Sequence, residues 1–197
     1  MISYGLFISV AFQIVLEGAE NAKVDVAAVR KILVENPDIT TVCIVHCETS
    51  SGVIHPVEEV GQAVAELLPT ATYFVDAMSS FGAMPLSFQK GNIDFLVSSA
   101  NKCIEGVPGF SFVVGKLEKL MQCKGWARSL SLDLVEQHVN LEKTGQFRFT
   151  PPTHAIIAFK KALEELAEEG GVAGRAARSV FYLFICAVKF VISSTLH

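Results

Sequence analysis

The sequence has few charged residues and no block of basic ones. Aspartate, glutamate, lysine and arginine make up 18% of its 197 residues, and the formal net charge is −4. Nucleic-acid-binding domains carry a basic patch or stripe, so this composition argues against a nucleic-acid partner. Hydrophobic residues make up 51% of the chain. That proportion favours one folded domain with a sizeable core over a disordered protein.

The cysteines follow neither a metal-binding nor a disulfide spacing. The five cysteines stand at positions 43, 47, 103, 123 and 186. Cys43 and Cys47 are four residues apart, and no second pair of cysteines or histidines completes a metal site with them. We therefore expect reduced thiols and no metal centre. Reduced thiols are typical of the cytoplasm, which is the predicted location, with a mitochondrial location left open.

Neither end of the chain carries a recognisable targeting or membrane-spanning segment. Residues 1–16 are apolar but lack the basic start and the cleavage site of a signal peptide. Residues 180–194 are apolar with one lysine, and a membrane span needs about 20 such residues. We expect no membrane association, an atypical N-terminal segment at 1–23 and an atypical apolar tail at 179–197.

Strand-like and helix-like patterns alternate between these ends. The patterns predict strands at 40–47, 71–77, 94–99 and 109–115, and helices at 24–36, 56–68 and 153–169. The first strand lacks polar alternation, which is typical of strands buried on both faces of a sheet. This order predicts an α/β fold with a mostly parallel sheet flanked by helices, with its core at residues 24–178. Ligands of such sheets bind beyond the carboxyl ends of the strands.

Polar side chains follow three of the predicted strands. The first strand ends in HCETSSG, where Thr49 and the two serines after it either cap local amides or offer hydroxyls to a ligand. Asp76 ends the second strand, and Lys102 follows the third in SANKC. Parallel strands would bring Asp76 and Lys102 to the same edge of the sheet.

Asp76 and Lys102 admit structural and chemical interpretations. Asp76 caps its own loop or pairs with a lysine, and a buried Asp76–Lys102 ion pair would serve stability alone. Alternatively, partial desolvation favours the neutral amine of Lys102, which can then form a Schiff base with an aldehyde. Pyridoxal phosphate needs such a lysine, together with an acid that keeps its ring nitrogen protonated. The spacing alone leaves these alternatives open.

Five segments resemble the class V aminotransferases, which have the aspartate aminotransferase fold type. They are VHCETSSG, VDAMSSFG, DFLVSSANKCIEGVPGFSFVV, ARSLSLDL and GQFRFTPPTHAIIAFKKALEELAEEGGV. They occur in order between Val24 and Arg178. Within the class, ANKCIEGVPGF is more similar to the 2-aminoethylphosphonate–pyruvate aminotransferase family than to the alanine–glyoxylate or serine–pyruvate enzymes.

The resemblance implies a fold, a cofactor and a reaction. It implies part of the large domain of a pyridoxal 5′-phosphate (PLP) enzyme of fold type I. The implied reaction transfers an amino group from 2-aminoethylphosphonate, or a similar small amine, to pyruvate through a lysine aldimine. By position in the motifs, Lys102 matches the aldimine lysine, which also shuttles the proton, and Asp76 matches the acid at the ring nitrogen.

The resemblance also assigns further cofactor contacts and an oligomeric state. Thr49 matches a residue whose hydroxyl lies near the ring oxygen, and Met78 and Asn101 match positions that line the cofactor. Thr150, in RFTPPT, matches a threonine that reaches the cofactor phosphate of the other subunit. The resemblance therefore implies a homodimer with shared active sites.

Part of the family pattern is missing from this sequence. Members of the family are roughly twice as long as this chain, well beyond one typical domain. They carry an upstream loop that cradles the cofactor phosphate and a downstream arginine that grips the substrate carboxylate. Arg175 and Arg178 precede that downstream region and do not match this arginine. Two hypotheses follow: a transaminase, or an inactive truncated fragment that pairs with a full-length subunit.

Overall fold

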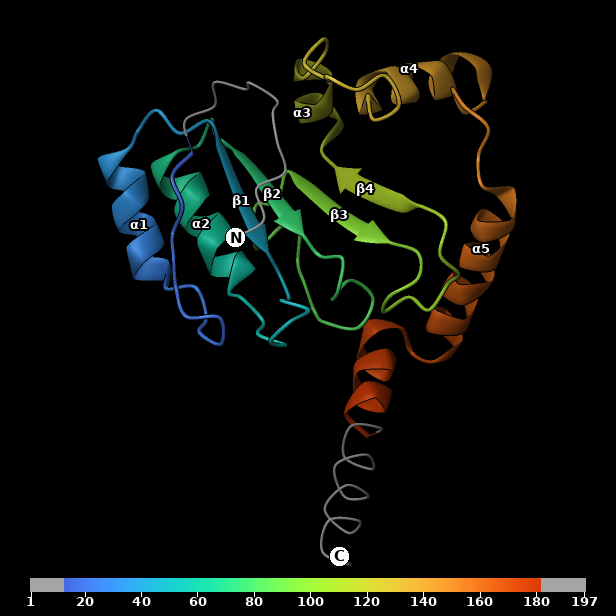
Figure 1. The fold of residues 1–197 in the computed structure, drawn as a ribbon, viewed down its shortest axis with the longest axis horizontal. Coiled ribbons are helices and arrows are strands. Elements are labelled where there is room, and N and C mark those ends of the chain that lie inside the picture. The colour runs from blue at the N-terminus through green and yellow to red at the C-terminus, as the bar shows by residue number, and fades with distance from the viewer. Residues whose placement is uncertain (1–12, 182–197) are drawn as a thin grey trace, which may run out of the picture.

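The computed structural model describes residues 13–181 (Figure 1). The expectations for residues 1–12 and 182–197 therefore lie outside the described residues. Within the described range, no helix is both long and apolar enough to cross a membrane.

A four-stranded sheet forms the centre of the molecule (Figure 1). Its strands are β1 (Thr41–Val45), β2 (Thr72–Asp76), β3 (Phe95–Ser99) and β4 (Ser111–Gly115), in this spatial order. The first three strands run parallel, and β4 pairs with β3 in the antiparallel direction. This arrangement confirms the expected α/β fold with a mostly parallel sheet.

The three predicted helices all form. They are α1 (Val26–Glu35), α2 (Val57–Leu67) and α5 (Thr153–Glu168). Asp25 caps α1 as its sequence position predicts, because its side chain accepts a hydrogen bond of 2.9 Å from the amide of Ala27. The sequence patterns did not predict α3 (Leu117–Gln122) and α4 (Leu134–Thr144), which are short or strongly polar. Residues 171–181 form a further helix after α5.

The core lies between one face of the sheet and α2. Tyr73 and Val75 of β2 and Leu96 of β3 are buried there together with Val60 of α2. The hydroxyl of Tyr73 donates a hydrogen bond of 2.8 Å to the carbonyl of Val57. Because alternate residues of a strand face opposite sides, Asp76 points to the other face of the sheet.

Two details of burial differ from the sequence-based expectation. In β1, Thr41 and Cys43 are exposed, so this strand is not buried on both faces. The physical reason is that β1 is the outer strand of the described sheet. In α5, apolar residues that include Phe159, Leu163 and Leu166 stand at helical spacing, which is typical of one buried face, yet Leu163 is 41% exposed, whereas Ala155 and Ala162 are buried. Ala155 lies against Gly109 before β4, where an added Cβ would come within 2.6 Å of the Cβ of Ala155.

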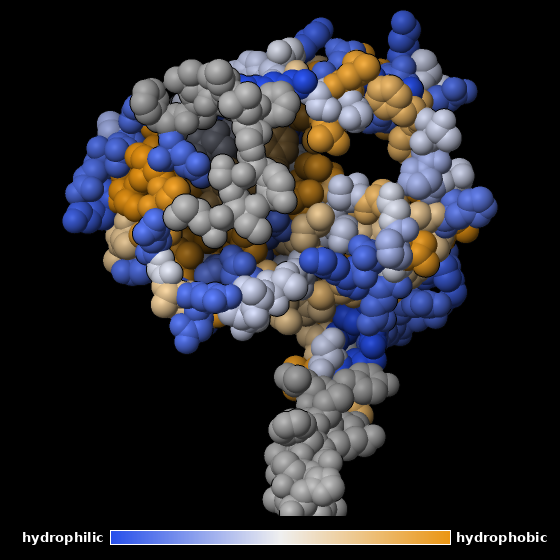
Figure 2. Space-filling view, viewed as in Figure 1, coloured by the Kyte–Doolittle hydropathy of each residue, from blue (hydrophilic) through white to orange (hydrophobic). Residues whose placement is uncertain are grey.

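α3 and α4 stand away from the sheet (Figure 2), whereas α5 packs on β4 through the rings of Phe159 and Phe112, whose centroids lie 5.4 Å apart. α4 packs against α3, and Figure 2 shows an opening between α4, α5 and β4. Hydrophobic residues are exposed around α3 and α4 at the upper right of the same view. The largest exposed side chains there are Trp126, Leu130, Leu132, Phe147 and Phe149, which we call the 126–149 surface.

Candidate active site

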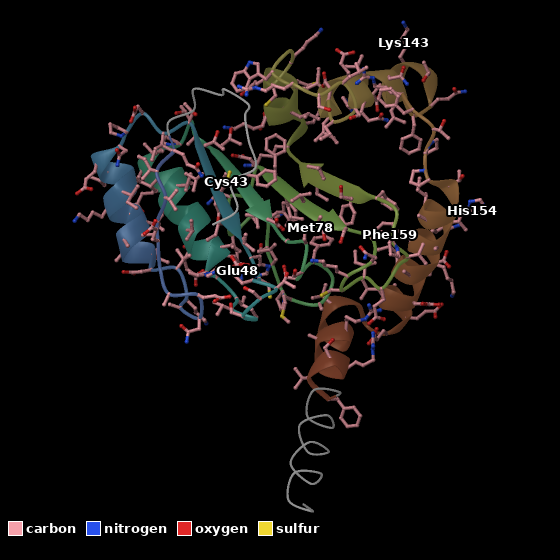
Figure 3. All side chains as sticks on the ribbon, in the orientation of Figure 1. Cys43, Glu48, Met78, Lys143, His154 and Phe159 are labelled. Atoms are coloured by element: carbon pink, nitrogen blue, oxygen red, sulfur yellow. The ribbon has the colours of Figure 1, made fainter. Side chains whose placement is uncertain are left out.

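The loops that follow β1, β2 and β3 meet at one edge of the sheet. The three strands are parallel, so their carboxyl ends lie side by side in the register Val45, Asp76 and Val97. Figure 3 shows Glu48 and Met78 at this end of the sheet. The structure therefore gathers the polar loop segments as the sequence order predicted.

A chain of hydrogen bonds connects all three loops. The ammonium group of Lys102 donates to Oγ of Ser79 over 3.1 Å. Oγ of Ser79 also lies 2.5 Å from Oγ1 of Thr49. Each residue belongs to a different loop, so Ser79 links the predicted lysine to the predicted threonine. The sequence motifs did not single out Ser79, although its place in DAMSSF, three residues after Asp76, marked it as a hydroxyl near a strand end.

Asp76 caps its own loop, as one of the structural interpretations held. Its Oδ1 accepts a hydrogen bond of 2.9 Å from the amide of Met78. Among the described residues, the other carboxylate oxygen has no hydrogen-bond partner, and no ion pair joins Asp76 to Lys102. One oxygen of a half-buried carboxylate is therefore left for a ligand.

Lys102 is more exposed than the sequence suggested. It lies in a turn after β3 and its side chain is exposed, so the expectation of a partly desolvated amine is wrong for this structure. The small and apolar neighbours along the chain led to that expectation. Those neighbours turn inward, as Ala100 and Ile104 are buried, and the turn carries Lys102 outward.

A buried histidine supports the site from the core side. The amide of His46 donates to the carbonyl of Asp76 over 2.7 Å, and Nδ1 of His46 shares a hydrogen bond of 2.8 Å with Oγ of Ser80. Burial lowers the pKa of His46, so the imidazole is neutral near pH 7. These contacts hold the ends of β1 and β2 together without adding a charge beside Asp76.

The other predicted cofactor contacts lie at different distances from this group. Met78 is half-buried two residues after β2, and Asn101 is exposed next to Lys102. Thr150 is exposed on the segment between α4 and α5. Hydrogen bonds thus connect Lys102 with Thr49 through Ser79, and Met78 with Asp76, whereas none connects Asn101 or Thr150 to them within the described range.

A second unpredicted residue adds an unused polar group. Asp76 pairs in register with Val97, so Ser99, two residues further along β3, lies on the same face of the sheet. Oγ of Ser99 is buried and has no hydrogen-bond partner among the described residues. Buried hydroxyls normally have partners, so this atom is suited to a ligand.

The residues present fit PLP. Lys102 provides an amine for its aldehyde, and Asp76 provides a free carboxylate oxygen for its ring nitrogen. Hydroxyls of Thr49, Ser79 and Ser99 can bind its oxygen atoms. The amine and the carboxylate follow neighbouring strands, and within the described residues they form no ion pair with each other. A cofactor placed between them requires both groups to be available.

Comparison with known proteins agrees with this geometry. The sequence matches the family "aminotransferase class-V" over residues 11–179. It is 51% identical over 164 residues to a 2-aminoethylphosphonate–pyruvate transaminase of Syntrophobacter fumaroxidans, covering 83% of this chain and 44% of the relative. A transaminase of the same name from Salmonella paratyphi C is 52% identical over 160 residues, covering 81% and 43%.

A solved structure has the same fold. Pyridoxamine–pyruvate aminotransferase from Mesorhizobium loti superposes with a TM-score of 0.71 at 30% identity, covering 79% of this chain and 40% of that one. The chain thus spans less than half the length of these relatives. Aminotransferases of this class depend on PLP, and the resemblance drawn from the five motifs is confirmed. This chain belongs to the class V aminotransferase family.

Proposed function

We propose that the chain is the cofactor-binding core of a transaminase that moves an amino group from 2-aminoethylphosphonate, or a similar small amine, to pyruvate. The observation that carries the proposal is the hydrogen-bonded chain of Thr49, Ser79 and Lys102 beside the free carboxylate oxygen of Asp76. The names of the relatives at about half identity support the choice of substrates.

The proposal gives each of these groups a role. Lys102 binds the cofactor through its amine and transfers the substrate proton at Nζ. Asp76 holds the proton on the ring nitrogen. The bound cofactor supplies an electron-withdrawing ring that acidifies the substrate carbon. Ser79 and Thr49 orient Nζ, which would otherwise rotate freely on an exposed side chain.

The proposal includes a homodimer. Trp126, Leu130 and Leu132 are 77%, 71% and 76% exposed, and large exposed apolar patches mark interaction sites. Thr150 follows the same surface in sequence and lies apart from the other site residues. A partner subunit bound to the 126–149 surface would cover these apolar side chains. It would also bring Thr150 close to the active site of the other subunit. A reducing compartment such as the cytoplasm fits the unpaired cysteines at 43, 47, 103 and 123.

A second candidate is a non-catalytic core that pairs with a full-length subunit. It is compatible with the share of the relatives that the chain spans, 44% and 43% of the two transaminases. A transaminase also needs groups that hold the cofactor phosphate and the substrate carboxylate, because positioning contributes much of the rate. The two candidates share cofactor binding at Lys102 and differ in turnover.

Reductive trapping tests cofactor binding. The purified chain is incubated with PLP, reduced with borohydride and mapped by peptide mass spectrometry. We expect one dominant adduct on Lys102, which Lys102→Ala abolishes and which Lys90→Ala, an exposed lysine in the loop before β3, leaves unchanged. Adducts spread over surface lysines, or an adduct that survives Lys102→Ala, would refute the proposal.

Turnover then separates the two candidates. Pyruvate-dependent consumption of 2-aminoethylphosphonate by the isolated chain would support the transaminase. The non-catalytic core would be supported if the isolated chain is trapped by PLP but shows no turnover, and turnover appears when a full-length relative's subunit is added.

A further inference from the structure

The turn that carries Lys102 is closed by its own backbone. The amide of Gly106 donates to the carbonyl of Ala100 over 2.8 Å, and the amide of Glu105 donates to the carbonyl of Lys102 over the same distance. Glu105 has a φ of +65°, a conformation that side-chain-bearing residues seldom adopt. Contacts from outside the turn must therefore hold it in place.

The inner side of the turn packs against the loop after β2. Ile104 is 1% exposed, and a Cβ added at Gly82 would come within 2.8 Å of its Cγ1. The sulfur of Cys103 donates to the carbonyl of Ser79 over 3.3 Å. The turn is thus fixed on the side that faces Ser79, the partner of Lys102.

Four charged residues hold the outer side. Arg175 donates from Nη1 to the carbonyl of Cys103 and from Nε to Oε2 of Glu169, both over 2.6 Å. Arg178 donates from Nη2 to both carboxylate oxygens of Glu105, over 2.8 and 2.9 Å, and from Nε to Glu169. The helix at 171–181 is thereby tied to the turn, about 70 residues earlier in the chain.

The charges and burial of this cluster indicate a rigid contact. Arg175 is 3% exposed, and a buried guanidinium is tolerated only when its donors are satisfied. Two arginines and two glutamates sum to zero formal charge. The cluster therefore fixes the position of the turn and adds no net formal charge near the amine of Lys102.

We propose that Arg175, supported by Arg178, Glu105 and Glu169, is a positioning residue for Lys102. The helix at 171–181 acts as a brace, because Arg175 on this helix binds the carbonyl of Cys103, the residue after Lys102. The brace keeps Lys102 beside Ser79. This inference rests on the proposed function for the role of Lys102. The brace itself is a property of the chain alone and is testable without cofactor.

The brace is expected to be insensitive to pH near neutrality. Hydrogen bonds from Arg178 and Arg175 lower the pKa of Glu169, so its carboxylate stays charged below the usual glutamate range. The folded pKa is lower than the unfolded one, so the contribution is present at neutral pH and is lost as the pH falls through the lowered pKa. The charged groups facing Glu169 are the two arginines, and Glu105 faces them from the turn.

Amide hydrogen exchange of the cofactor-free chain tests the brace directly. We expect Arg175→Gln to speed exchange at the amides of Glu105 and Gly106 by at least about tenfold. Glu66→Gln, which breaks the exposed Arg30–Glu66 pair between α1 and α2, should leave these amides unchanged. Unchanged exchange at the turn in Arg175→Gln would overturn the inference.

The trapping reaction at Lys102 supplies the second readout. Arg175→Gln should slow PLP trapping at Lys102 by about tenfold, whereas trapping at other lysines stays unchanged. Arg175→Lys should restore part of the rate because it keeps the charge. If Arg175→Gln does not fold, Arg178→Gln is measured instead, because the Arg178 side chain is 35% exposed, and the same direction of change is expected. Faster exchange in the variant with no trapping even in the wild type would uphold the brace and refute the proposed function.

Discussion

Ser79 is the residue on which the geometry of the candidate site depends most directly. It hydrogen-bonds both Lys102 and Thr49. Lys102 is exposed, and within residues 13–181 its amine has no hydrogen-bond partner other than this hydroxyl. A serine three residues beyond a strand end is typical of an ordinary loop in sequence, and only the meeting of three strand ends gives it a role.

Removal of this hydroxyl should weaken cofactor binding without unfolding the chain. We expect Ser79→Ala to lower the affinity for PLP by roughly five- to tenfold, since a typical net hydrogen bond contributes about 1 kcal/mol. Ser129→Ala is the control, because within residues 13–181 its hydroxyl hydrogen-bonds that of Ser131 and no group of the candidate site. Fluorescence or absorbance titration with PLP measures the effect, and equal affinity in both variants would contradict it.

At the scale of elements, the close approach of α2 to the sheet places the strand ends. Gly61 of α2 lies against the loop before β3, and a Cβ added there would come within 1.7 Å of the carbonyl oxygen of Gly91. It would also lie 2.7 Å from the ring of Tyr73. A glycine inside a helix disfavours helix formation, so this position is occupied for packing and not for helix propensity.

Gly61→Ala should destabilise the fold despite its better helix propensity. The propensity gain is about 1 kcal/mol, whereas overpacking costs typically about 1 to 3 kcal/mol, and the clash of 1.7 Å with backbone places the cost at the upper end, so we expect a net loss of up to about 2 kcal/mol. Gly18→Ala is the matched control, since nothing lies within 4 Å of the added Cβ. Urea unfolding measures both, and a Gly61→Ala chain as stable as the wild type would show that α2 can shift freely.

At the scale of the whole molecule, the apolar 126–149 surface is the largest unexplained feature. It lies around α3 and α4, which stand away from the sheet (Figure 2). The exposure of several large apolar side chains in one region is costly in water. A second copy of the chain covering this surface is the oligomer that the proposed function includes.

A charge placed on this surface should dissociate the proposed dimer. We expect the double variant Leu130→Asp, Leu132→Asp to raise the dissociation constant by at least about tenfold, because burying unpaired carboxylates costs more than the lost apolar contact alone. Val34→Asp on α1, where Val34 is 64% exposed, is the control. Size-exclusion chromatography with light scattering gives the mass, and a wild-type chain that is monomeric at high concentration would contradict the prediction.

Local sequence patterns were sufficient to infer the strands, the three main helices and the placement of Asp76 and Lys102 after neighbouring strands. Buried strands and amphipathic helices follow from the spacing of apolar residues, and the positions of Asp76 and Lys102 follow from strands running in parallel. Shared motifs with the class V aminotransferases supplied the chemistry. The patterns failed at α3 and α4, which are too short or too polar to leave a strong periodic signal.

Tertiary structure alone settled which neighbours each polar group meets. Lys102 is exposed and contacts Ser79, and Arg175 donates to the carbonyl of Cys103, so both contacts join segments far apart in the chain. The hydroxyl of Ser99 is buried without a partner among the described residues. Apolar periodicity reports which side of an element is buried, but carries no information on which distant loop faces a given side chain. The proposal that Lys102 binds the cofactor therefore rests on its motif, whereas the contacts around Lys102 became visible only in the folded chain.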